Sequence, residues 1–182
     1  MVTAADPVNS RIEKFIDKAV AAGAEVIRLE GQGAAIAYLK IFLRDNDVRS
    51  FLVSPELKAR PPFREEFIGA LEMLPAGELW ADAGIVAADF GVAETGTLVH
   101  FDRSDEEKNV WTLPEICFCL LDNGKIVQDL EAIAPELSSH LARTDLPSPQ
   151  VSLVTGPSRT ADIENELTIG VHGPSRLVIL MI

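Results

Sequence analysis

Short apolar runs alternate along this chain with segments of helical spacing, and this alternation constrains the fold more than any other feature of the sequence. Residues 116–121 (ICFCLL) and 177–182 (LVILMI) are continuous apolar runs, typical of strands buried on both faces of a sheet. Between such runs, apolar residues recur at intervals of three and four, as on the buried side of a helix. The order of these segments predicts an α/β fold with a mainly parallel sheet, in one domain spanning residues 1–182.

The same patterns place the other elements. Strands are expected at residues 24–29, 49–53, 84–90, 97–101 and 151–155, and helices at 34–44, 63–71 and 130–141. Ser10 and Glu13 have the spacing of a capping box at the start of a first helix, which Gly23 would end. Gly31 and Gly33 are interpreted as a turn, since the remaining features of a dinucleotide loop are missing. Residues 102–108 (DRSDEEK) are predicted to form a solvated loop, with the three acids 105–107 at the surface.

Charge and cysteine content exclude several classes of function. The net charge of −12 and the absence of a basic run argue against nucleic-acid or membrane binding. With no signal-peptide pattern and no apolar stretch of membrane length, we expect a cytoplasmic protein. Cys117 and Cys119 point to one face of a strand and are interpreted as buried small hydrophobes, with soft-metal binding or a redox response as the alternative. Two cysteines and three scattered histidines predict neither a metal site nor a resident cofactor.

Residues 88–98 (ADFGVAETGTL) contain a small-residue turn that has the groups to bind a ligand. Glu94 precedes Thr95-Gly96-Thr97, where a tight backbone and two hydroxyls would suit a carboxylate or phosphate. Glu94 is the candidate catalytic residue, as general base or nucleophile, and it could also accept a hydrogen bond from a ligand hydroxyl. Alternatively, its carboxylate accepts backbone N–H bonds and holds the turn.

Residues 155–164 (TGPSRTADIE) form the second candidate segment. If the strand before them ends at the carboxyl edge of the sheet, they would occupy the position where open α/β sheets bind ligands. A helix containing Asp162 would then present free N–H groups to an anion, assisted by the Arg159 guanidinium. The residues expected to bind the anion are Thr155, Gly156, Ser158, Arg159 and Thr160. Alternatively, Ser158 and Thr160 are helix caps and Arg159 pairs with Asp162, Glu94 or Glu164.

Residues 170–174 (GVHGP) place His172 between Gly170 and Gly173, where a turn is expected. Its imidazole would contact a ligand or exchange a proton there, or alternatively serve in capping and packing. His100 and His140 lack such a context and are interpreted as structural.

Taken together and in this order, the segments 88–98, 155–164 and 170–174 resemble the signatures of the lactate utilization protein C family, the LUD domain. The resemblance covers residues 84–182. It implies a three-layer fold similar to the sugar-phosphate isomerase and CoA-transferase superfamily, and a role beside iron–sulphur proteins that support oxidation of L-lactate to pyruvate. Where this family often has a histidine after a Leu-Pro step, the chain has Glu115 after Leu113-Pro114.

The resemblance leaves two main hypotheses. In the first, the chain is a non-redox accessory subunit that binds an anionic small molecule or a partner. In the second, it is an independent transferase- or isomerase-like enzyme acting on an acyl-CoA, a sugar phosphate or a similar anion. In the resembling CoA transferases a glutamate carries the acyl group, but this chain lacks their full motif around Glu94. A binding module with a vestigial pocket is a third alternative.

Overall fold

The computed structural model describes residues 7–66, 72–73, 81–146, 149–160, 168–170 and 172–182. Within these ranges, a six-stranded sheet has the order β1-β12-β7-β4-β2-β3, and every neighbouring pair of its strands is parallel. Its strands are β1 (Glu25–Arg28), β2 (Ser50–Val53), β3 (Glu72–Met73), β4 (Ala83–Ala87), β7 (Ile116–Leu121) and β12 (Arg176–Met181). The predicted α/β class with a mainly parallel sheet is confirmed.

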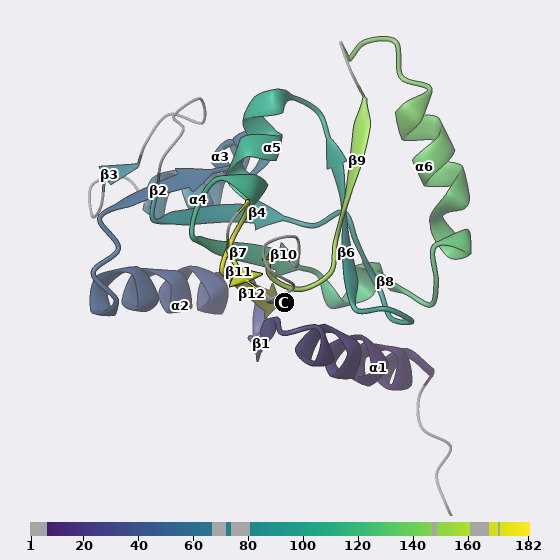
Figure 1. Ribbon diagram of the computed structural model, residues 1–182, viewed down its shortest axis with the longest axis horizontal. Coiled ribbons are helices and arrows are strands. Elements are labelled where there is room, and N and C mark those ends of the chain that lie inside the picture. Colours follow the sequence, from purple (N-terminus) through teal and green to yellow (C-terminus); the bar gives the residue numbers. More distant parts are fainter. Residues whose placement is uncertain (1–6, 67–71, 74–80, 147–148, 161–167, 171) are drawn as a thin grey trace, which may run out of the picture.

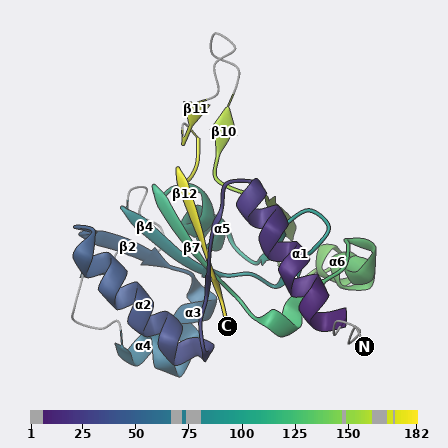
Figure 2. The same ribbon diagram turned by 90° about the horizontal axis from the view of Figure 1, so that it is seen from below.

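Helices and a second sheet cover the two faces of the parallel sheet, which gives the three layers. One face packs on α2 (Gly31–Asp45), α3 (Pro55–Ala59) and α4 (Pro61–Glu66), while the other packs on α1 (Pro7–Ala21) and α5 (Asp105–Thr112). Figure 2 shows α2, α3 and α4 on one side of the strands and α1 on the other. Each face of the sheet carries an apolar core, and alternate residues of β7 point into one or the other. Cys117 and Cys119 face α1 and α5, and Phe118 and Leu120 face α2.

The second sheet has the order β8-β5-β6-β9. Its strands are β5 (Phe90–Val92), β6 (Thr97–Asp102), β8 (Ile126–Val127) and β9 (Gln150–Val154). Strands β5 and β6 form an antiparallel hairpin, and β9 pairs antiparallel with β6. Helix α6 (Ala134–Leu141) follows the 3-10 turn Glu131–Ile133; the turn packs on this sheet through Ile133 and the helix through Leu137. Figure 1 shows β6, β9 and α6 together at one side of the parallel sheet.

A small antiparallel hairpin of β10 (Arg159–Thr160) and β11 (Thr168–Ile169) projects from one end of the molecule, as Figure 2 shows. A further 3-10 turn, Asn123–Lys125, connects β7 to β8. No helix in the described ranges combines the length and apolar character needed to cross a membrane.

Four local predictions are wrong. The first helix begins at Pro7, so Ser10 lies inside it and does not cap it. Gly31 and Gly33 lie in the first turn of α2, not in a separate turn before a helix. Residues 102–108 are not a solvated loop, because β6 includes Asp102 and α5 begins at Asp105.

The fourth error concerns the second candidate segment. The strand before it, β9, belongs to the antiparallel sheet and therefore does not end at the carboxyl edge of the parallel sheet. Arg159 and Thr160 form β10 and do not start a helix. Asp162, which the predicted helix would contain, lies outside the described residues. The predicted helix therefore does not begin at Arg159 or Thr160, and residues 161–167 lie outside the described ranges.

Candidate functional site

The first two signature segments lie side by side, although more than fifty residues separate them in the sequence. The Thr97 hydroxyl lies 2.7 Å from the Thr155 hydroxyl, and also 2.7 Å from the Thr95 hydroxyl. The register of β6 with β9, which pairs Leu98 with Val154, produces this contact. Thr95, Thr97 and Thr155 thus form a continuous hydroxyl chain, and the structure joins the predicted ligand residues of both segments.

Two signature glycines bring the backbone against the C-terminal end of α1. Gly96 has a φ of +70°, and a Cβ at this position would lie 2.3 Å from the backbone nitrogen of Ala19. Gly156 has a φ of +72°, and its Cβ would lie 2.2 Å from the carbonyl oxygen of Ala22. Both positions require glycine for conformation and for space. The close approach that the sequence predicted is therefore made to a helix of the same chain.

Arg159 also contacts this end of α1. Its Nη2 donates a hydrogen bond of 2.5 Å to the carbonyl oxygen of Ala22, just beyond the last turn. A cation is favourable here because the C-terminal end of a helix carries partial negative charge. The observed partner differs from the three carboxylates considered for Arg159. Only the remaining N–H groups of the guanidinium are left for an anion.

Glu94 and Thr95 are exposed at the tip of the β5–β6 turn. The main-chain N–H of Glu94 donates to the carbonyl oxygen of Gln128 at 3.0 Å, which attaches the turn to the chain after β8. The candidate catalytic carboxylate therefore lies on an open surface and does not line the cavity described next.

A cavity of about 250 Å³ lies between α5, β9 and the chain that leads into β12. Four predicted ligand residues line it: Thr155, Gly156, Ser158 and His172. The main-chain N–H of Ser158 donates to the carbonyl oxygen of Pro174 at 2.9 Å, so the second and third signature segments lie side by side in the lining. The lining does not include Glu94, Thr95, Gly96, Thr97 or Arg159. The hydroxyl chain nevertheless reaches the cavity through Thr155.

Several polar side chains line this cavity. The hydroxyls of Thr155 and Ser158 and the exposed imidazole of His172 can donate hydrogen bonds, whereas the Ser152 hydroxyl already donates to Asp102 Oδ2. Trp111 also lines the cavity and is 3% exposed; its buried Nε1–H has no hydrogen-bond partner among the described residues. In a chain of net charge −12, the described lining residues include no carboxylate. Such a lining favours a small ligand rich in acceptor oxygens.

A buried cluster of charged side chains lies behind the cavity and was missed at the sequence level. Both His100 and Glu107 are almost fully buried, and His100 Nε2 lies 3.5 Å from Glu107 Oε1 and 3.9 Å from Asp102 Oδ1. Arg103 contacts Asp89 at 2.9 Å and Glu107 at 3.5 Å. Glu107 was expected at the surface because it ends a run of three acids. The spacing Ser104-x-x-Glu107 is the signal that could have identified it, since the Ser104 hydroxyl caps α5.

Burial and charge act differently on the two carboxyls next to His100. Burial raises the pKa of Asp102 above its ordinary value, although a hydrogen bond from Ser152 and the charge of His100 oppose this effect. Burial would also raise the pKa of Glu107, but the adjacent His100 and Arg103 hold that pKa below its ordinary value. Asp102 is therefore the carboxyl in this cluster that retains a proton more readily.

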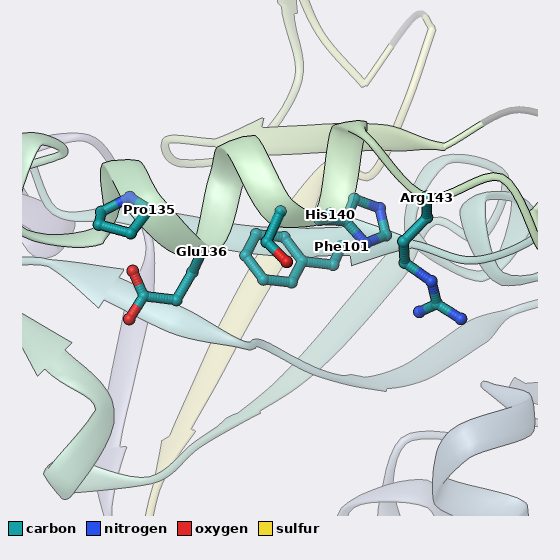
Figure 3. Close-up of a pocket in the computed structure, with 6 residues that line it drawn as sticks. Phe101, Pro135, Glu136, His140 and Arg143 are labelled. Carbon is teal, nitrogen blue, oxygen red and sulfur yellow. The ribbon is translucent and has the colours of Figure 1, made fainter.

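A second hollow, of about 450 Å³, lies along α6 (Figure 3). His140 stacks on Phe101 with ring centroids 4.8 Å apart, and its Nε2 donates to the carbonyl oxygen of Gln150 at 2.9 Å. These contacts fit the structural role expected of His140. The hollow along α6 is lined by Phe101, Pro135, Glu136, Ser139, His140 and Arg143, none of which is a predicted ligand residue.

The interpretation of Cys117 and Cys119 as buried small hydrophobes is confirmed. Both side chains are fully buried in the core under α1 and α5. Burial raises the pKa of the Cys117 thiol to about 12. Across the described ranges, no three His, Cys, Asp or Glu side chains are grouped so that they could hold a metal ion.

The fold is similar to a solved structure. The crystal structure of a DUF162 family protein from Deinococcus radiodurans matches with a TM-score of 0.67 and 19% sequence identity, over 97% of this chain and 98% of that chain. At this identity the match supports the three-layer α/β fold.

Curated relatives match at the sequence level. An uncharacterized protein of Neisseria meningitidis serogroup B is 40% identical over 102 residues, which are 56% of this chain and 42% of that protein. Lactate utilization protein C of Geobacillus kaustophilus is 29% identical over 102 residues, again 56% of this chain and 42% of that protein. Lactate utilization protein C of Macrococcus caseolyticus is 28% identical over 180 residues, 99% of this chain and 70% of that protein. The aligned part of the first two relatives is thus less than half of their length.

The model of the LUD domain matches residues 76–182, which include the hydroxyl chain, the cavity lining and the buried cluster. This range contains all three signature segments and more than half of the chain. The chain therefore belongs to the LUD domain family.

Proposed function

We propose that this protein is a non-redox accessory subunit, or ligand-binding protein, of an iron–sulphur-dependent system that oxidises L-lactate to pyruvate. Relatives named lactate utilization protein C support the assignment to lactate utilization. The partners would be the iron–sulphur proteins of that system, and the ligand would be an anionic small molecule.

The observation that carries the proposal is the donor-rich cavity formed by two signature segments. Ser158 and His172 come from different segments and line the same space, together with Trp111, whose buried Nε1–H has no partner among the described residues. A carboxylate or phosphate would satisfy these donors, and a charged acceptor roughly doubles the strength of such hydrogen bonds. The small volume favours a compact acid over a large nucleotide.

The non-redox part of the proposal rests on the position of the two cysteines. Cluster iron is held by thiolates, and the raised pKa of the Cys117 thiol opposes formation of a thiolate. Since Cys117 and Cys119 also face the packed core, we assign electron transfer to the partners.

A ligand screen tests the binding site. The change in midpoint of thermal unfolding would be measured with L-lactate, pyruvate, sugar phosphates and CoA esters, for the wild type and for Trp111→Phe and Ser158→Ala. We expect one chemical class to raise the midpoint in the wild type and to lose most of that effect in both variants. Ser139→Ala, in the hollow along α6, is the matched control and should respond like the wild type.

Copurification tests the role in the larger system. Coexpression with iron–sulphur proteins of lactate oxidation should recover a complex, and the isolated protein should not turn over L-lactate. Failure to associate with such partners would contradict the accessory role. Turnover of an acyl-CoA or sugar phosphate by the isolated protein, lost in Glu94→Gln, would instead support an independent enzyme.

A further inference from the structure

The hydrogen bonds of His100 determine where its protons lie. Nδ1 lies 2.9 Å from the carbonyl oxygen of Ala87, which can only accept a hydrogen bond, so Nδ1 carries a hydrogen. Nε2 faces Glu107 Oε1 at 3.5 Å and Asp102 Oδ1 at 3.9 Å. Neither Nε2 nor Asp102 Oδ1 has a hydrogen-bond partner within the described part of the chain.

Without a further proton, this arrangement would place the Nε2 lone pair against two carboxylate oxygens in a buried site. Repulsion of this kind is strong where water is excluded. It is relieved if Nε2 carries a second hydrogen or if one carboxyl is protonated. The geometry therefore favours one proton in the cluster of His100, Asp102 and Glu107 beyond those of a neutral imidazole and two carboxylates.

The other charged groups around His100 do not remove this requirement. Asp89 Oδ2 lies 3.6 Å from Nδ1, but Arg103 and the main-chain N–H of Phe101 already bind the Asp89 carboxylate, at 2.9 Å and 2.8 Å. From α3, Glu56 contacts Arg103 at 3.4 Å. From α5, the charge of Lys108 acts on Asp102. Four carboxyls thus face three cations, since Arg60 also pairs with Glu56, and the excess of carboxyls favours retention of a proton within the cluster.

Ser152 connects this cluster to the cavity. Its hydroxyl donates a hydrogen bond of 2.6 Å to Asp102 Oδ2 from strand β9, and Ser152 lines the cavity wall. Trp111 makes a second connection, because it lines the cavity and its ring packs edge-to-face on His100 at 5.0 Å. The cavity therefore has a titratable group directly behind one of its hydroxyls.

We propose that His100, Asp102 and Glu107 store a proton behind the cavity, and that Ser152 exchanges protons between this store and a bound ligand. From the loaded store, a proton on Asp102 bonds to Ser152 Oγ, while the original Ser152 proton bonds to a ligand oxyanion. In reverse, an O–H bond of the ligand breaks, its proton bonds to Ser152 Oγ, and the original Ser152 proton returns to Asp102 Oδ2 of the emptied store. No group is oxidised or reduced in this exchange.

The ligand class that suits this step is a small acid with a second oxygen that gains or loses a proton, such as an enol or a hydroxyl group. Its anionic group would occupy the donor side of the cavity, and the second oxygen would contact Ser152. Asp102 and His100 are positioning residues, since they act through Ser152. This inference rests on the proposed function only for the use of the cavity as the ligand site.

Nuclear magnetic resonance without any ligand tests the proton store. The three histidines of the chain can be followed by their ring ¹⁵N shifts, and Asp102 and Glu107 by their carboxyl ¹³C shifts. At neutral pH we expect either N–H signals at both ring nitrogens of His100, or the shift of a protonated carboxyl at Asp102. A bare Nε2 together with two ionised carboxylates would overturn the proposal.

Exchange of the stored proton with water tests the connection through Ser152. We expect Ser152→Ala to slow this exchange at least about tenfold, because a positioned proton-transfer group is removed. Asp102→Asn keeps an oxygen that can accept the Ser152 hydrogen bond and should also slow exchange at His100. Thr112→Ala is the matched control, since Thr112 lines the same cavity but its hydroxyl donates to the Lys108 carbonyl.

Equal exchange rates in Ser152→Ala and the wild type would refute the connection. The two proposals can fail separately. A stored proton that exchanges through Ser152, in a protein that no tested acid binds, would contradict only the proposed function. Binding of an acid to a protein with a bare Nε2 and two carboxylates would contradict only the proton store.

Discussion

Substitution of Gly96 by alanine should destabilise the protein strongly, because the signature turn is pressed against α1. At a φ of +70°, the added Cβ would lie 2.3 Å from Ala19 N and 2.5 Å from Lys18 C, both backbone atoms. Backbone atoms inside a helix cannot move aside as a flexible side chain can. Either the turn or the end of α1 must therefore shift.

The expected loss combines two contributions. A left-handed backbone conformation costs a residue with a Cβ about 1–2 kcal/mol relative to glycine. Forcing extra volume into a packed contact costs about 1–3 kcal/mol. We therefore expect Gly96→Ala to lower the free energy of unfolding by about 2–5 kcal/mol, a large part of the ~5–15 kcal/mol that stabilises typical domains.

Urea unfolding followed by circular dichroism measures this loss. Gly33→Ala is the matched control, because Gly33 lies in α2 and a Cβ there would meet no atom within 4 Å. Alanine is a better helix former than glycine, so Gly33→Ala should gain up to about 1 kcal/mol. A Gly96→Ala protein within about 0.5 kcal/mol of the wild type, a change typical of ordinary surface sites, would refute this account of the turn.

Three further predictions concern charged and ionisable groups. Arg159→Ala should lower the free energy of unfolding by about 0.5–1 kcal/mol in thermal or urea unfolding, because it removes a cation from the C-terminal end of α1; unchanged stability would contradict this role. Because the folded pKa of Asp102 is raised above 3.8, ionisation of this group costs stability as pH rises through and above that value. Asp102→Asn should therefore gain stability relative to the wild type as pH rises above about 4, the pKa of an unfolded aspartate, and a pH-independent difference between the two unfolding curves would contradict this sign. In the native protein, Cys117 and Cys119 should resist a thiol reagent at about pH 8, where an ordinary thiol is partly ionised, and both should react in urea; rapid labelling of the folded protein would show that they are accessible.

The parallel sheet could be predicted because its central strands carry an unambiguous pattern. Strands β7 and β12 contact other elements on both faces, so they are apolar at nearly every position and stand out as short continuous runs. The edge strand β1 is short and has exposed ends, yet its β-branched residues and Gly23 still identified it.

The sheet to which β9 belongs could not be predicted from the same kind of pattern. Partial burial of β9 is compatible with an edge position in either sheet. The pairing of β9 depends on contacts with β6, a strand that lies about fifty residues earlier in the sequence. The predicted place of β9 at the carboxyl edge of the parallel sheet is therefore wrong, while Thr155, Gly156, Ser158 and His172 still came together at a cavity. Their clustering depends on the end of β9 and on the chain before β12.

The buried cluster was missed for a different reason. A run of acids is usually solvated, and its burial became visible only when Glu107 was placed on the inner side of α5. Counting charges cannot reveal which member of such a run faces inward. The capping spacing with Ser104 gives the orientation of the helix and hence the inward position of Glu107.

The position of β12 between β1 and β7 sets an order for folding during synthesis. Glu25 pairs with Val178, so β1 leaves the ribosome on the order of ten seconds before its partner strand has been made. Until then, β1 and β7 both have an unpaired edge, and such edges readily pair with other chains. Nascent molecules should therefore need chaperone protection until β12 emerges, and variants that delay its insertion should aggregate during expression even where the finished protein is stable.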